Sequence, residues 1–275
     1  MTINTLLRKV NQSKKFNINT YDFFKPTFNV KLAESRGEIK LAQKLRYKVF
    51  FSERIKNPIL NIGNFRRDSD KFDNYADHII VTHRKSKFSK TKVIGTYRLL
   101  KQSVAEKKSG FYSCDEFNLE NLLNSRIYNN MLELSRSCIS QKFRNKNVLQ
   151  LMWKEIHHYI NKNNIDALFG TASFLSTNVS KIEDQLIYLN HHHKMPDNIT
   201  VSALPKYRVN IDYQKKINLN IRLFAKLPTL IKAYLKFNAS IGTGAVIDNK
   251  FKTTDVFIFL PIEKINKEYV NKILD

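Results

Sequence analysis

Residues 131–140 (MLELSRSCIS) form a nearly continuous apolar run that carries one acid and one base, Glu133 and Arg136. Such a run predicts a buried strand, and ionised side chains inside it are costly unless they are partnered or used. A basic connector without glycine follows at 141–147 (QKFRNKN), and 148–161 then has apolar residues at helical spacing. Many α/β proteins hold a phosphate at such a junction, because unpaired amides and the helix dipole point at the anion.

The other periodic segments alternate between strand and helix patterns. Strands are predicted at residues 28–33, 78–83, 93–100, 167–172 and 255–260, and helices at 38–53, 116–123 and 181–189. The strands at 78–83 and 93–100 form a predicted hairpin, whereas those at 131–140 and 167–172 are joined by a helix. This combination predicts an α/β protein with a mixed sheet covered by helices.

The chain divides into three predicted parts. Residues 1–27 are a polar tail, 28–200 form the core, and 201–275 are a C-terminal extension that completes the domain. Within the extension, 223–237 interleaves apolar residues with lysines. Two interpretations stay open for this stretch: a helix lying on an anionic membrane surface, or a helix packed on the domain with its lysines in solvent.

The net charge of +23 allows an anionic partner of several kinds. The partner could be nucleic acid, an anionic membrane surface or an acidic protein. A compositional bias toward lysine would also explain the charge. The Lys and Arg residues are spread along the whole chain, and no DNA- or RNA-binding fingerprint accompanies them. We therefore expect no nucleic-acid partner.

Neither the cysteines nor the histidines predict a disulfide or metal centre. Cys114 and Cys138 do not form a disulfide framework or a C-x-x-C pair. The three histidines at 191–193 cannot all point at one ion, and no acid or cysteine supports them at ligand spacing. Without an 18-residue apolar run or a signal peptide, we expect a cytoplasmic protein, soluble or peripheral at the inner membrane.

Several motifs recur in the order of known enzyme families. The first half carries 45–50 (LRYKVF), Asp70 and Asp73, 95–100 (GTYRLL) and 133–136 (ELSR). This order resembles the core of the acyl-homoserine-lactone synthases, which are relatives of the GNAT acyltransferases. The second half is similar to the bacterial L-ornithine Nα-acyltransferases of ornithine-lipid synthesis, at residues 227–241 (LPTLIKAYLKFNASI), 244–248 (GAVID) and 253–260 (TTDVFIFL).

The resemblance implies a GNAT-like fold and a defined reaction. A 3-hydroxyacyl chain would move from acyl carrier protein to the α-amino group of L-ornithine, giving lyso-ornithine lipid. It implies no metal and no cofactor, with the acyl carrier protein as co-substrate. Alternatives remain: a lactone synthase, an N-acyltransferase for another amino acid, and a non-catalytic basic protein that binds membrane surfaces. The oligomeric state stays open.

The connector departs from the GNAT pattern Q-x-x-G-x-G/A, because residues 141–147 contain no glycine. Close approach to the pyrophosphate of coenzyme A is then disfavoured. Cations at Lys142, Arg144 and Lys146 suit the single phosphate of a phosphopantetheine arm and the acidic carrier around it. This difference favours a carrier protein as the donor.

Aminolysis of a thioester needs a group that accepts a proton from the ammonium form of the amine. Glu133 is the candidate base, with a structural ion pair to Arg98 or Arg136 as the alternative. In a regular strand, residues 133 and 136 face opposite sides. The fold family is known for a bulge in this strand, and we predict one near residues 134–135.

Other residues are candidates for binding the acceptor amino acid. Its carboxylate suits a bidentate arginine, its side-chain ammonium suits an aspartate, and an aromatic side chain could line the acyl channel. The candidates for these substrate contacts are Arg46, Arg98, Arg136, Asp70, Asp73 and Phe50.

Overall fold

The computed structural model describes residues 26–53, 66–144, 146–217, 221–266 and 268. They form an eight-stranded mixed sheet whose main path is β1-β2-β3-β5-β6-β10-β8, with β9 beside β10. The predicted N-terminal tail, residues 1–27, lies outside this description except at its end, as does most of the predicted loop at 54–70. The predicted mixed sheet is confirmed.

The first half of the sheet is antiparallel. It contains β1 (Thr27–Leu32), β2 (Asp77–Arg84), β3 (Lys92–Lys101) and β5 (Met131–Ile139). β2 pairs with β3 as the predicted hairpin, and β3 pairs with β5. β5 then pairs in parallel with β6 (Ala167–Phe174) after the crossover helix α5 (Lys146–Asn163), so the predicted strand-helix-strand unit is confirmed.

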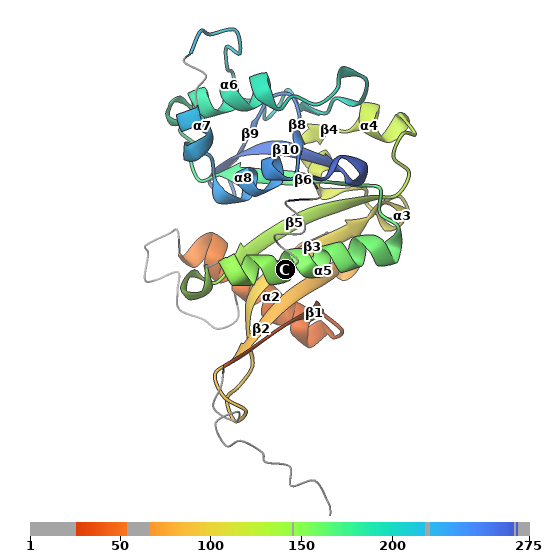
Figure 1. Ribbon diagram of the computed structural model, residues 1–275, viewed down its shortest axis with the longest axis vertical. Coiled ribbons are helices and arrows are strands. Elements are labelled where there is room, and N and C mark those ends of the chain that lie inside the picture. The colour runs from red at the N-terminus through yellow and green to blue at the C-terminus, as the bar shows by residue number, and fades with distance from the viewer. Residues whose placement is uncertain (1–25, 54–65, 145, 218–220, 267, 269–275) are drawn as a thin grey trace, which may run out of the picture.

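Two helices cover this half. The helix α2 (Arg36–Tyr47) begins at Ser35, whose hydroxyl accepts the Glu38 amide at 3.2 Å, and continues as a π-helix, Lys48–Ser52. The helix α5 places its apolar stripe on the strands, with Met152 and Ile156 fully buried. Figure 1 shows α5 in front of β2 and β3 and α2 behind them.

The second half comes mainly from the C-terminal extension. β10 (Thr253–Pro261) pairs with β6 along almost its whole length, and β8 (Ser240–Ile241) and β9 (Val246–Asp248) flank it. The helices α6 (Glu183–His192), α7 (Ile221–Lys226) and α8 (Thr229–Lys236) lie around these strands (Figure 1). Because β10 is buried throughout, the extension supplies a central strand.

The apolar residues of α8 lie in the core. Ile231 is fully buried, and the Tyr234 hydroxyl is 2.7 Å from the Tyr97 hydroxyl of β3. Trp153 of α5 packs edge-on against Tyr234, as expected for a core residue. The membrane-surface interpretation of residues 223–237 is therefore wrong for these side chains, because the domain itself covers them. Among the described residues, no helix is both long and apolar enough to cross a membrane.

One predicted element differs. The expected helix at 116–123 is instead β4 (Phe117–Asn118) followed by the short helix α4 (Glu120–Asn124). β4 pairs with β7 (Ser202–Ala203), a contact with the distant extension that local periodicity does not reveal. The remaining short elements are α3 (Gln102–Ala105) and 3₁₀ helices at Lys71–Asn74, Tyr112–Asp115, Gln141–Phe143, Val179–Lys181, Asp197–Ile199 and Ile262–Lys264.

A β-bulge interrupts β5. Thr96 of β3 pairs with Cys138 and Arg98 pairs with Ser135, so one residue of β3 faces two residues of β5, Arg136 and Ser137. Arg136 has a φ of 54°, in the left-handed region. The predicted bulge is confirmed, but it lies just after residues 134–135.

The bulge coincides with a divergence of β5 and β6. The two strands pair only from Met131 to Glu133 and from Ala167 to Phe169. At the next residue, Gly170, an added Cβ would lie 2.1 Å from the Leu134 carbonyl oxygen. Only glycine allows the two backbones to pass so closely as they separate.

Gly170→Ala should lower the free energy of unfolding by about 2–3 kcal/mol, because the new methyl group overlaps backbone that cannot rotate away. Urea denaturation measures the change. The matched control is Gly37→Ala in the first turn of α2, where the added Cβ meets only the Ser35 hydroxyl, at 3.6 Å. That variant should be neutral or up to about 1 kcal/mol more stable. Equal effects at the two positions would contradict the proposed close approach.

Candidate active site

A buried ion-pair network lies beside the bulge, and Arg46 of α2 is at its centre. The Arg46 side chain is fully buried, with Nε 2.9 Å from Asp68 Oδ2. Its Nη1 and Nη2 donate to the two carboxylate oxygens of Asp73, at 2.8 and 2.7 Å. This bidentate geometry is the strongest form of the arginine–carboxylate contact.

Two further arginines complete the network. Arg98 of β3 places Nη1 2.6 Å from Asp70 and 3.2 Å from Asp73. Arg136, at the bulge, places Nη2 3.0 Å from Asp70 and Nε 3.2 Å from Asp68. Three arginines thus meet three aspartates, and their formal charges cancel.

The local sequence places these aspartates. Asp70 caps the 3₁₀ turn Lys71–Asn74 by accepting the Phe72 amide at 3.0 Å, and Asp73 accepts the Asp70 amide at 3.2 Å. Burial alone would raise the pKa of Asp73, but its bonds to Arg46 and the charge of Arg98 hold that pKa well below its usual range. Asp73 therefore stays ionised.

This network occupies several of the predicted substrate contacts. Arg46 has both of its carboxylate partners within the protein, and Asp73 is 4% exposed and bound by two arginines and Gln43. Asp70 is shared by Arg98 and Arg136. These groups reach a ligand only if the network opens. Arg98 Nη2 differs, because it is buried without a hydrogen-bond partner among the described atoms.

Glu133 lies fully buried on β5. One oxygen accepts the Ser113 amide at 2.7 Å and the Ser113 hydroxyl at 2.6 Å, and the other accepts the Tyr112 amide at 2.9 Å. Burial raises the pKa of Glu133, and the three donors oppose that rise. The expected alternative, an ion pair with Arg98 or Arg136, is absent from the salt bridges of the described residues. Glu133 instead holds the turn Tyr112–Asp115 against the sheet.

Arg136 joins this turn to the C-terminal hairpin. Its guanidinium carbon lies 4.4 Å from the centre of the Tyr112 ring and 4.7 Å from that of Phe251. Phe251, in the turn between β9 and β10, also meets the predicted channel residue Phe50 edge-on at 5.5 Å. The bulge therefore brings Arg136 into contact with Tyr112 and with the C-terminal extension.

The basic connector forms a 3₁₀ turn, Gln141–Phe143, directly before α5. Lys142 is exposed on it. Arg144 is also exposed, but it pairs with Glu53 and donates to the Ile139 carbonyl at 3.0 Å. The side chain of Lys146 lies outside those that the structure describes.

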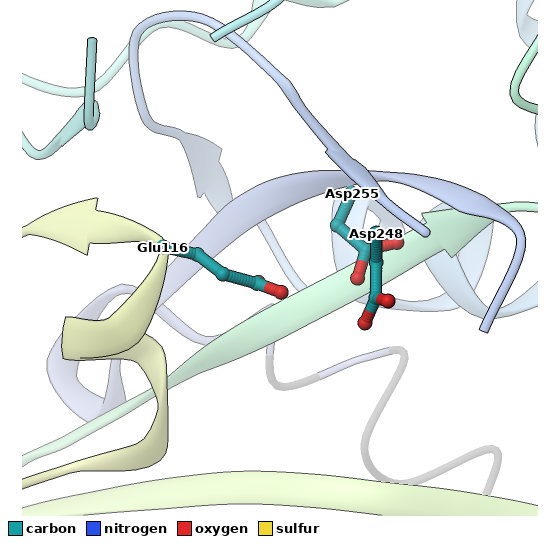
Figure 2. A group of neighbouring side chains, drawn as sticks. All are labelled: Glu116, Asp248 and Asp255. Carbon is teal, nitrogen blue, oxygen red and sulfur yellow. The ribbon is translucent and has the colours of Figure 1, made fainter. Parts of the chain in front are cut away.

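Sequence reasoning missed a second acidic group, formed by Glu116, Asp248 and Asp255. One carboxylate oxygen from each lies within 4.8 Å of the others. Figure 2 shows the three side chains converging, Glu116 from the segment before β4 and the aspartates from the β9–β10 hairpin. Both aspartates belong to quoted motifs, but their approach to Glu116 depends on the hairpin register, in which Asp248 pairs with Thr253.

Comparison with known proteins places this site in a family. A family model described as "Acetyltransferase (GNAT) domain" matches residues 45–154, which include the end of α2, the whole of β5 and the arginines and aspartates of the Arg46 network. The L-ornithine N(alpha)-acyltransferase of Brucella abortus is 39% identical over 248 residues, covering 89% of this chain and 88% of that protein. The protein of the same name from Rhizobium meliloti is 38% identical and covers 88% of this chain and 82% of its own length.

Solved structures are less similar. FeeM, an N-acyl amino acid synthase from uncultured soil microbes, covers 87% of this chain and 94% of its own, with 7% identity and a TM-score of 0.48. A similarity of this size does not support a conclusion about function.

Arg46→Met should lower the free energy of unfolding by about 3–5 kcal/mol, because it leaves Asp68 and Asp73 buried without their main cation. Urea denaturation at pH 7 measures the loss. Lys44→Met, the same type of change at an exposed position of the same helix, is the control and should stay within about 0.5 kcal/mol. A loss for Arg46→Met no larger than for the control would contradict the structural role of the network.

Proposed function

The chain belongs to the L-ornithine N(alpha)-acyltransferase family and is an acyltransferase, and we propose on this premise that it acylates the α-amino group of L-ornithine. The acyl group is a 3-hydroxyacyl chain, the donor is acyl carrier protein, and the product is lyso-ornithine lipid. The observation that carries the proposal is the 39% identity to a relative of that name over 89% of the chain. A shared fold alone would not identify the acceptor.

The reaction forms one amide bond and breaks one thioester bond. The uncharged α-amine attacks the thioester carbonyl, the C–N bond forms, and the C–S bond breaks as the thiol of the carrier arm leaves. The ammonium form of the amine must first lose a proton, and the leaving thiolate takes one up. The protein therefore has to accept a proton near the acceptor nitrogen.

Glu133 is the proposed proton acceptor, and its surroundings favour an indirect route. The carboxylate is fully buried, so the amine does not reach it in the described conformation. Its short bond from the Ser113 hydroxyl, at 2.6 Å, offers a relay from that hydroxyl to the carboxylate. Burial raises the pKa of Glu133, which makes the carboxylate a better base near neutral pH.

Two side chains support binding of the acceptor carboxylate and of the acyl donor. The unpartnered Nη2 of Arg98 is a donor available to a carboxylate of the acceptor. The exposed Lys142, in the turn before α5, supports docking of an acidic carrier and its phosphate, and the net charge of +23 adds long-range attraction.

The function is tested by expressing this chain alone in a host that lacks ornithine lipids and analysing the lipids by mass spectrometry. The expected result is a new ion with the mass of a 3-hydroxyacyl amide of ornithine. A lysine or glutamine amide would replace the acceptor and keep the chemistry. Absence of any acylated amino acid, despite folded protein in the cells, would contradict the proposal.

Glu133→Gln should lower kcat by about 100-fold or more if Glu133 accepts the proton. The wild-type rate should fall as pH decreases through the raised pKa of Glu133, since the protonated acid is no base, and the variant should lack this limb. Steady-state rates from pH 5 to 9 measure both effects. The substitution also replaces one of the carboxylate oxygens that accept the Tyr112 and Ser113 amides. The free energy of unfolding should therefore fall by about 1–3 kcal/mol.

The control for that variant is Glu106→Gln, at an exposed position. It should leave both the rate and its pH dependence unchanged. If Glu133→Gln lowers the rate by the same factor at every pH and keeps the acidic limb, Glu133 positions the turn and is not the base.

A further inference from the structure

The protein has two groups of three acids, and only one of them is neutralised. Asp68, Asp70 and Asp73 share three arginines. For Glu116 and Asp255 and their neighbour Asp248, no salt bridge to a Lys or Arg is present among the described residues. In a chain with 47 Lys and Arg residues and 24 Asp and Glu residues, a group of three acids without a Lys or Arg partner is unusual.

Part of this second group is buried without partners. Asp255 is 4% exposed, and its Oδ1 has no hydrogen-bond partner in the described part of the chain. The same holds for Glu116 Oε2. The hydroxyl of Thr253, which is 1% exposed and shares a face of β10 with Asp255, lies close enough to Asp255 to lower its pKa but forms no hydrogen bond of normal geometry with a described residue. Buried polar atoms are normally satisfied, so these atoms point to a ligand.

The electrostatics agree with this conclusion. Burial and the charge of Asp255 raise the pKa of Glu116 to about 8. Burial raises the pKa of Asp255 to about 6 although the Ser173 and Thr253 hydroxyls oppose the rise, and the charge of Asp248 adds to it. Near pH 7 a proton on Glu116 therefore takes the place of a cation when none is bound. A bound cation would remove the repulsion that causes these shifts.

The acidic group is close to the groups that surround Glu133. Glu116 directly follows the turn Tyr112–Asp115, whose amides hold Glu133. Phe251, between the two aspartates in sequence, stacks on Arg136. The group also lies beside the part of β6 that has separated from β5, because Asp255 pairs with Ser173, beyond Gly170.

We propose that Glu116, Asp248 and Asp255 bind the side-chain ammonium of the acceptor amino acid. The inference rests on the proposed function and identifies the residues that select a diamino acid. Asp255 would form the floor of the site, and the half-buried Glu116 and Asp248 its rim. This assignment takes the place of Asp70 and Asp73, which the arginines already occupy.

The chemistry favours an ammonium ion over a divalent metal. A primary ammonium has three N–H donors, which matches three convergent carboxylates. Magnesium and calcium require about six or more oxygen ligands in defined geometry, and these three acids supply only part of such a shell. An acceptor with a neutral side chain would leave the acids uncompensated, and this gives discrimination that a hydrophobic pocket cannot provide.

The test compares two acceptors, L-ornithine and L-norvaline, which differ only by the terminal amino group. We would measure kcat/KM for both with the wild type, Glu116→Gln, Asp248→Asn and Asp255→Asn. Each variant should lower kcat/KM for ornithine by about 10- to 100-fold, the value of a lost charge-assisted bond. For norvaline, kcat/KM should stay within about twofold or rise.

Glu120→Gln is the same change at an exposed position four residues from Glu116. It should leave kcat/KM unchanged for both acceptors. An equal loss for ornithine and norvaline in the folded variants would overturn the inference, since it would indicate a structural role. If Asp255→Asn does not fold, the two rim variants decide the result in the same way.

Two further outcomes separate the hypotheses. If the wild type acylates ornithine but the variants keep its preference over norvaline, the ammonium site is wrong and the proposed function stands. If the wild type acylates neither amino acid, the proposed function fails first. Calorimetric titration with Mg²⁺, Mn²⁺ and Ca²⁺ completes the test: micromolar binding that Asp248→Asn abolishes would assign a metal site and overturn the inference.

Discussion

The buried pairing of Arg46 with Asp68 and Asp73 is the contact on which the site depends. It ties α2 to the segment before β2, and through Arg98 and Arg136 it reaches β3 and β5. Isolated buried charges are costly, but a closed group with bidentate geometry and no net charge offsets most of that cost. Because removal of one member leaves the others uncompensated, the network holds four elements in one arrangement.

The network lies next to the point where β5 and β6 separate. The bulge at Arg136 turns that side chain toward Asp68 and Asp70, and Gly170 lets the Leu134 carbonyl pass at close range. β6 then continues with β10 as its partner. The C-terminal extension therefore completes the sheet and also brings the β9–β10 hairpin to the side of the divergence.

Charge compensation distinguishes a structural acidic group from one suited to a ligand. The aspartates around Arg46 are satisfied within the protein, and the pKa of Asp73 is held low. The group around Asp255 has no salt bridge to a Lys or Arg in the described part of the chain, and the pKa values of Glu116 and Asp255 are raised. Two acidic groups in one domain can thus have opposite roles, decided by whether arginines accompany them.

The sequence by itself determined the six long strands, the crossover helix and the family, because periodicity and motifs are local properties, and the resemblance to the family gave the bulge in 131–140. It also gave Glu133 and Arg136 as candidate site residues. Only the tertiary structure decided that Asp73 is occupied, that the apolar side of α8 is buried, and that Glu116 meets Asp255. The physical reason is that a charge is neutralised, and an apolar face is buried, by residues far away in the sequence. Only strand register and packing bring such residues together.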